Sequence, residues 1–216
     1  MHQAHVIEFT VHSQADFQTP IPLEEARLTE IAKEICKSSL APHINVGEIS
    51  LITEDDLFDY DLKIPMFNNS AELILNPQNV TVTFRSGRTS PHLKLISECT
   101  VSLMKLAVRH PIKRSVTTFS AQAAFDSQES YLGYMKQFAN GELRIGSGGI
   151  ILFADLPDWE GEMRFATEKS MFYPNGIFVT GQASTSKGLS PEFSEAFAKR
   201  FEEVAKHHGL ELGFTE

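Results

Sequence analysis

Residues 46–64, VGEISLITEDDLFDYDLKI, align without a gap with residues 145–163, IGSGGIILFADLPDWEGEM, at a shift of 99 positions. Five of the nineteen columns are identical: Gly47/Gly146, Ile52/Ile151, Asp56/Asp155, Leu57/Leu156 and Asp59/Asp158. A second match follows in the same order, PQNVTVT at 77–83 with PNGIFVT at 174–180, at a shift of 97. Internal similarity of this kind predicts that the chain is a duplication.

Each half has the same expected order of elements. In the first half, alternation of His5, Ile7, Phe9 and Val11 with other residues predicts a half-buried strand. It is followed by a helix over 23–39, strands over 44–53, 60–66, 71–75 and 80–85, and a helix over 91–109. The second half repeats this with a strand over 115–125, a helix over 128–138, strands over 149–153, 162–166 and 177–182, a helix over 191–208, and a short edge strand over 210–214.

The expected fold class is therefore α+β, with a β-α-β-β-β(β)-α unit present twice, over residues 1–112 and 113–216, in one pseudo-symmetric domain. Strands joined by short turns pair antiparallel, so each half should give a curved antiparallel sheet with helices on one face. This order of elements resembles the TATA-binding-protein-like, or helix-grip, arrangement, in which two such halves form a pseudo-twofold saddle. The resemblance rests on topology and implies a fold, not a function.

Composition excludes several classes of protein. The chain has 216 residues, of which 42% are hydrophobic and 22% charged, and a formal net charge of −9. It lacks the basic stripe that nucleic-acid binding needs and the long apolar run that would span a membrane. The first residues do not form a basic and then apolar signal, which predicts a cytoplasmic protein. In that compartment Cys36 and Cys99 are expected as buried thiols without a disulfide.

The acidic-aromatic segments of the two halves are the candidate binding site. Their residues are Asp56, Asp59, Tyr60 and Asp61 in the first half and Asp155, Asp158, Trp159 and Glu160 in the second. Two such loops could present carboxylates and an aromatic face to a cation, an amine or a basic peptide. In the alternative interpretation, the aspartates belong to turns and the aromatic rings pack as lids on the strands that follow. We therefore expect a binding or regulatory protein, with a protein or small-molecule partner, no cofactor and no catalytic motif.

An enzyme is the alternative hypothesis. The strand HVIEFTV at 5–11 is similar to the first strand of vicinal-oxygen-chelate metalloenzymes, which also duplicate a β-α-β-β-β unit, and the resemblance implies that His5 is a metal ligand. The terminal helix of each half is extra to that fold, and the matching strand of the second half, residues 114–121, holds no His or Glu. His5 and His12 are seven residues apart, on opposite faces of a strand unless a bulge intervenes. No metal site is therefore expected.

Two further segments carry expectations. Gly146, Ser147, Gly148 and Gly149 precede the apolar run 150–153, which favours a turn or bulge over a phosphate-binding loop. The helix expected over 91–109 has apolar residues on more than one face. It should be central or contribute to a subunit interface, so a homodimer is expected.

Overall fold

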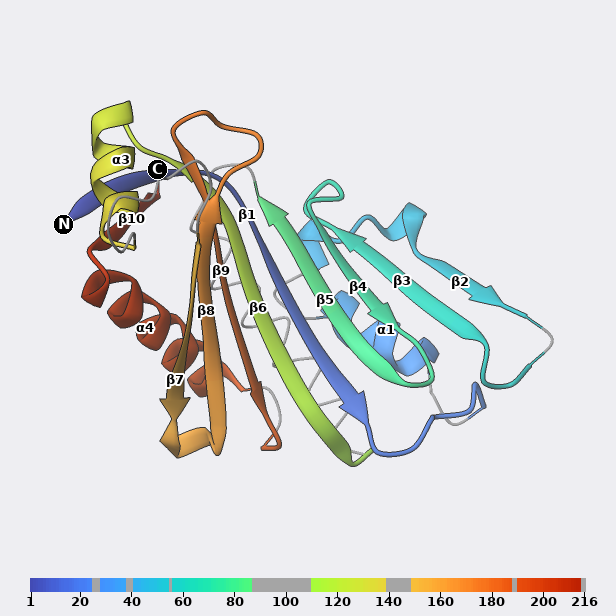
Figure 1. Cartoon of the computed structure of the whole chain (residues 1–216). Coiled ribbons are helices and arrows are strands. Elements are labelled where there is room, and N and C mark those ends of the chain that lie inside the picture. The colour runs from blue at the N-terminus through green and yellow to red at the C-terminus, as the bar shows by residue number, and fades with distance from the viewer. Residues whose placement is uncertain are drawn as a thin grey trace.

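Ten strands form a single sheet, against which three α-helices lie, in the part of the chain that the structure describes (Figure 1). The structure is a computed structural model and describes residues 1–24, 28–37, 41–54, 56–86, 110–138, 149–187 and 190–214. The elements of the first half are β1 (His2–Phe17), α1 (Leu28–Lys37), η1 (Ala41–His43), η2 (Val46–Glu48), β2 (Ser50–Thr53), β3 (Tyr60–Met66), β4 (Ala71–Leu75) and β5 (Asn79–Ser86). Those of the second are β6 (Ile112–Ala124), α3 (Gln128–Lys136), β7 (Gly149–Leu156), η3 (Pro157–Trp159), β8 (Gly161–Lys169), β9 (Gly176–Thr185), α4 (Pro191–His207) and β10 (Leu210–Phe214). The fold class is α+β, as the sequence predicts.

The sheet is centred on the long strand β1. The strand order is β2-β3-β4-β5-β1-β6-β9-β8-β7, with every neighbour antiparallel. One edge of β1 pairs with β6, and the other is shared by β5, opposite residues 9–16, and by β10, opposite residues 2–6. β10 runs parallel to β1, which differs from the all-antiparallel expectation.

The buried face of the sheet packs against helices. The ring of Phe201 on α4 lies 5.1 Å from that of Phe119 on β6 and 5.3 Å from that of Phe165 on β8. Gly181 on β9 allows this close approach, because a Cβ there would collide with the Phe201 ring. Figure 1 shows α1 and α4 on the same side of the sheet, behind its strands. The nearer side, called the open face below, has no described helix over it.

Local capping explains where α3 and α4 begin. The Ser127 hydroxyl accepts from the backbone N–H of Ser130 at 3.1 Å, and the Ser190 hydroxyl accepts from that of Phe193 at 3.2 Å. Such N-caps satisfy backbone donors that the first turn leaves without partners. Gly209 follows α4 with φ of +74°, a conformation that favours glycine. Both helix starts confirm the expected boundaries.

The expected strand over 44–53 is largely wrong. Within this range only Ser50–Thr53 forms a strand; η2 occupies Val46–Glu48, and Ile44 makes an isolated antiparallel bridge to Met66. The Asn45 side chain stabilises this turn, because its Nδ2 donates to Asn69 Oδ1 at 3.0 Å.

The expected helix over 91–109, with Cys99 and the dimer argument drawn from it, lies outside the described residues, as do Gly146, Ser147 and Gly148. Within the described ranges, no helix combines the length and the apolar character needed to cross a bilayer.

Candidate functional site

The open face carries a row of polar side chains across its centre. Four of its residues stand opposite one another on neighbouring strands: Thr83 of β5, His12 of β1, Thr118 of β6 and Gln182 of β9. His12 Nδ1 lies 3.0 Å from Thr83 Oγ1, and Gln182 Nε2 donates to Thr118 Oγ1 at 3.4 Å. This surface offers hydroxyl, amide and imidazole groups to a partner.

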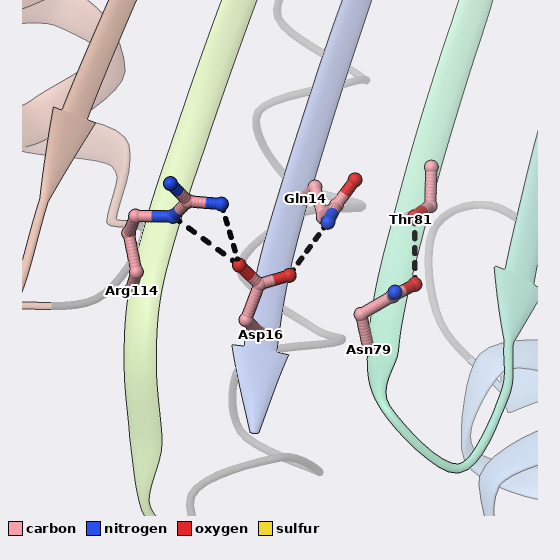
Figure 2. Close-up of polar contacts among 5 residues, drawn as sticks. All are labelled: Gln14, Asp16, Asn79, Thr81 and Arg114. Atoms are coloured by element: carbon pink, nitrogen blue, oxygen red, sulfur yellow. Dashed lines mark hydrogen bonds and ion pairs between the residues drawn. The ribbon is translucent and has the colours of Figure 1, made fainter. Parts of the chain in front are cut away.

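Arg114, at the lower end of the central strands, forms an ion pair with Asp16 on the open face (Figure 2). Arg114 donates to Asp16 Oδ2 from Nη2 at 3.0 Å and from Nε at 3.2 Å, and Gln14 Nε2 donates to Asp16 Oδ1. On β5, Thr81 Oγ1 donates to Asn79 Oδ1 at 3.1 Å. The Asp16 carboxylate offsets the Arg114 charge, so this pair adds no net positive charge to the open face.

A shallow depression lies on the loop between β2 and β3. It has a volume of about 820 Å³ and is lined by Glu54, Asp56, Leu57, Phe58 and Asp59. Leu57 is 50% and Phe58 51% exposed, so apolar surface lies among three carboxylates. The loop is ordered by Asp56, whose Oδ1 accepts from the N–H of Phe58 at 2.9 Å and whose carbonyl accepts from that of Asp59 at 3.0 Å. We call this feature the acidic depression.

Tyr60 anchors the base of the acidic depression and does not line it. Its side chain is 2% exposed, and its hydroxyl donates to the Ile21 carbonyl at 3.0 Å. Burial raises the pKa of Tyr60 to about 12. The Leu23 N–H donates to the Leu57 carbonyl at 2.9 Å, so a second bond ties the loop to the 21–23 segment. This buried ring has no face available to a cation. Asp61 follows it on β3, half-buried and opposite Ile52 of β2.

The acidic loop of the second half is partly neutralised. Lys187 Nζ donates to the Asp158 carbonyl at 2.9 Å and lies 3.4 Å from Glu160 Oε1. The Trp159 ring packs against Phe193 of α4, with ring centroids 5.3 Å apart, and its carbonyl accepts from Thr185 Oγ1 at 2.9 Å. Tyr60 and Trp159 therefore both pack towards the core, which supports the alternative interpretation for the two aromatic rings.

The two acidic loops do not come together. Asp155 is exposed on β7 and stands opposite Glu162 of β8, so the second loop and its strands are also acidic. Strands β4, β5, β1, β6 and β9 lie between β3 and β8. At about 4.8 Å per strand, β3 and β8, the strands that begin where the two loops end, are about 29 Å apart. Figure 1 shows the two loops at opposite lateral edges of the sheet. One small cation cannot contact both loops.

Three residues of the acidic depression were missed by the sequence analysis: Glu54, Leu57 and Phe58. Leu57 and Phe58 are adjacent apolar residues inside an otherwise acidic turn. Because a turn between two strands is solvent-exposed, that pair was the available signal for an apolar contact surface.

The histidines of β1 do not form a site. A register shift between Val6 and Glu8 places His5 and His12 on the same face, as the sequence analysis allowed for a bulge. Seven residues at about 3.3 Å each still separate them by about 23 Å. His5 Nε2 lies 3.2 Å from Asp126 Oδ1. Over the described residues, no three His, Cys, Asp or Glu side chains are arranged to hold a metal ion.

Comparison with known proteins gives no family for this chain. No protein-family model matches it, and no curated protein matches its sequence.

Proposed function

We propose that this chain is a non-catalytic binding protein that recognises a basic segment of a protein partner at the acidic depression. The observation that carries the proposal is the exposure of Leu57 and Phe58 among the carboxylates of Glu54, Asp56 and Asp59. Lysine and arginine combine an apolar stem with a cationic head. The stem matches the apolar residues and the head the carboxylates, and Phe58 adds a ring face for a cation.

An extended partner fits this surface better than a small amine. The strands that begin where the two acidic loops end, β3 and β8, are about 29 Å apart, which an extended chain of about nine residues would span. The strands between the loops carry polar side chains at that end of the open face, Gln14 and Asn79 among them, which supply hydrogen-bonding groups. The first loop is the main contact in this proposal, because Lys187 already offsets the charge of Glu160 in the second loop.

The fold proposal is that the chain arose by duplication and is similar to the TATA-binding-protein-like saddle. The mirror order of the strands supports it: moving outward from the central β1–β6 pair, β5, β4 and β3 on one side correspond to β9, β8 and β7 on the other. The match at a shift of 97 pairs β5 with β9, which hold equivalent positions. The match at a shift of 99 pairs β3 with β8, which are the third and second strands from the centre, so this match does not follow the mirror order.

The proposal includes a cytoplasmic location and a homodimer. Low cysteine usage, two residues in 216, suits a reducing compartment and supports a cytoplasmic location. A homodimer is retained as a proposal, resting on the apolar residues of the sequence over 91–109.

Neutralising the acidic depression should weaken binding of a basic peptide. The probe is an amidated deca-lysine peptide, titrated calorimetrically into the full chain. Asp56→Asn with Asp59→Asn should lower the affinity about 5–30-fold, because each lost charge contributes about 0.5–1 kcal/mol. The amide introduced at position 56 keeps an oxygen that accepts from the Phe58 N–H, so the loop should remain ordered. Phe58→Ser should cost a further two- to fivefold.

A matched control separates site binding from general charge attraction. Glu195→Gln with Glu211→Gln removes two exposed carboxylates away from the depression and gives the same formal net charge, −7 in place of −9. This control should lose less than twofold in affinity. Equal losses in the two double variants, or no binding by the native chain, would contradict the proposal.

A further inference from the structure

A second, smaller pocket lies on the open face at the far end of β3. It has a volume of about 110 Å³, and its lining includes Pro65, Asn69, Ala71, Glu72, Thr83 and Arg85. Glu72 stands opposite Thr83 in the β4–β5 pair, and the Arg85 N–H donates to the Ser70 carbonyl at 2.6 Å. The acidic depression adjoins the start of β3 and this pocket adjoins its end, so about 20 Å of strand separates them.

The pocket has one cationic and one anionic side chain that do not pair. Glu72 and Arg85 are diagonal neighbours on one face of the sheet, a relation that places their Cα atoms about 7–8 Å apart. Among the described residues, neither the Arg85 guanidinium nor the Glu72 carboxylate forms an ion pair or a hydrogen bond. Two opposite, unpaired charges that line one small pocket suit a ligand that carries both charges itself.

The polar groups between these charges are held in place by neighbours. Thr83 Oγ1 is bonded to His12 Nδ1 at 3.0 Å, and Asn69 Oδ1 accepts from Asn45 Nδ2 at 3.0 Å. Pro65 provides the apolar part of the lining. A binding surface whose side chains are already positioned loses less conformational entropy when it binds.

We propose that this pocket binds a small free α-amino acid, with the ligand carboxylate on Arg85 and the ligand ammonium on Glu72. Arginine recognises carboxylates through parallel N–H donors, and both contacts are charge-assisted. The volume corresponds to about four water molecules, so it accepts the charged end of the ligand and a side chain about the size of that of serine. A simple anion such as phosphate is disfavoured, because the Glu72 carboxylate would repel it. This inference does not rest on the proposed function.

The test is a titration of the ¹⁵N-labelled full chain with L-serine, followed by amide chemical shifts. Serine should shift the amides of residues 69–72 and 83–85. Arg85→Met and Glu72→Gln should each weaken binding at least about tenfold, since each removes a charge-assisted hydrogen bond. Acetate and ethylammonium, which carry one charge each, should bind at least about tenfold more weakly than serine. Arg164→Met, a cation removed from another part of the open face, should leave the affinity within twofold.

Three outcomes would overturn the inference: unchanged amides on addition of serine, acetate binding as well as serine, or unchanged affinity in Glu72→Gln. Arg85 is exposed and Glu72 half-buried, so neither substitution removes core packing. Thr83→Val offers a second perturbation, expected to weaken serine binding about two- to tenfold. The Asp56→Asn, Asp59→Asn variant should bind serine as the native chain does. Loss of deca-lysine binding at the acidic depression and loss of serine binding at this pocket can therefore be told apart.

Discussion

Replacing Phe193 with alanine is expected to lower the free energy of unfolding by about 3–5 kcal/mol. Phe193 is fully buried, and its ring lies 5.3 Å from that of Trp159. Truncation leaves a cavity between α4 and the loop after β7. Trp159 is the only tryptophan, so its emission reports on this contact and should shift to longer wavelength. Urea unfolding followed by circular dichroism measures the stability change.

Phe172→Ala is the matched control for that substitution. The Phe172 side chain is 77% exposed on the loop between β8 and β9, so its loss should change stability by no more than about 0.5 kcal/mol. A loss below about 1 kcal/mol in Phe193→Ala, with unchanged tryptophan emission, would mean that α4 does not pack as described.

Raising the pH from 10 to 12 is expected to remove about 2 kcal/mol of stability for each of two buried tyrosines. Burial raises the pKa of Tyr60 to about 12. It also raises the pKa of Tyr134 to about 12, against a smaller lowering by the Thr167 hydroxyl. The unfolded chain ionises near the ordinary tyrosine pKa of about 10. The contribution of each buried tyrosine to the free energy of unfolding is therefore full below pH 10 and is lost as the pH rises through the folded-state pKa.

The variant Tyr60→Phe with Tyr134→Phe isolates this effect. It lacks both phenols, so its stability should fall less than that of the native chain over the same pH range. At neutral pH it should be less stable by about 1 kcal/mol, because the hydrogen bond from Tyr60 to the Ile21 carbonyl is lost. Parallel pH profiles for the native chain and the variant, measured by urea unfolding, would show that these phenols are solvated.

The strands were largely predictable because alternation of apolar residues marks a sheet with one buried face. In β3, residues Tyr60, Leu62, Ile64 and Met66 are buried, and those between them are not, as the sequence indicates. The full length of β1 was not predictable from this pattern. Its later buried positions include the polar Ser13, whose Oγ lies 3.2 Å from Thr117 Oγ1 of β6, a partner 104 residues away. Pairing with three other strands fixes that length, and local sequence does not encode it.

The candidate site was predictable in composition but not in geometry. The acidic residues lie in and beside turns, as the sequence indicates, whereas the fate of the aromatic rings depends on tertiary contacts. Tyr60 reaches Ile21 and Trp159 reaches Phe193, and neither contact leaves a local sequence signal. The separation of the two loops follows from the strand order, in which β2 and β7 form opposite edges of the sheet. Phe58, two positions before Tyr60 in the acidic segment, is the ring that remains exposed.

Amide chemical shifts on addition of deca-lysine show where the peptide contacts the chain. If the acidic depression is the recognition surface, the largest shifts on titration into the ¹⁵N-labelled chain should fall on the described amides between residues 54 and 61. Smaller shifts should follow at residues 155–162, and these effects should weaken as added salt screens the charges. Shifts centred on the exposed side of α4, or small uniform shifts with no cluster near the β2–β3 loop, would show that the acidic depression does not recognise the peptide.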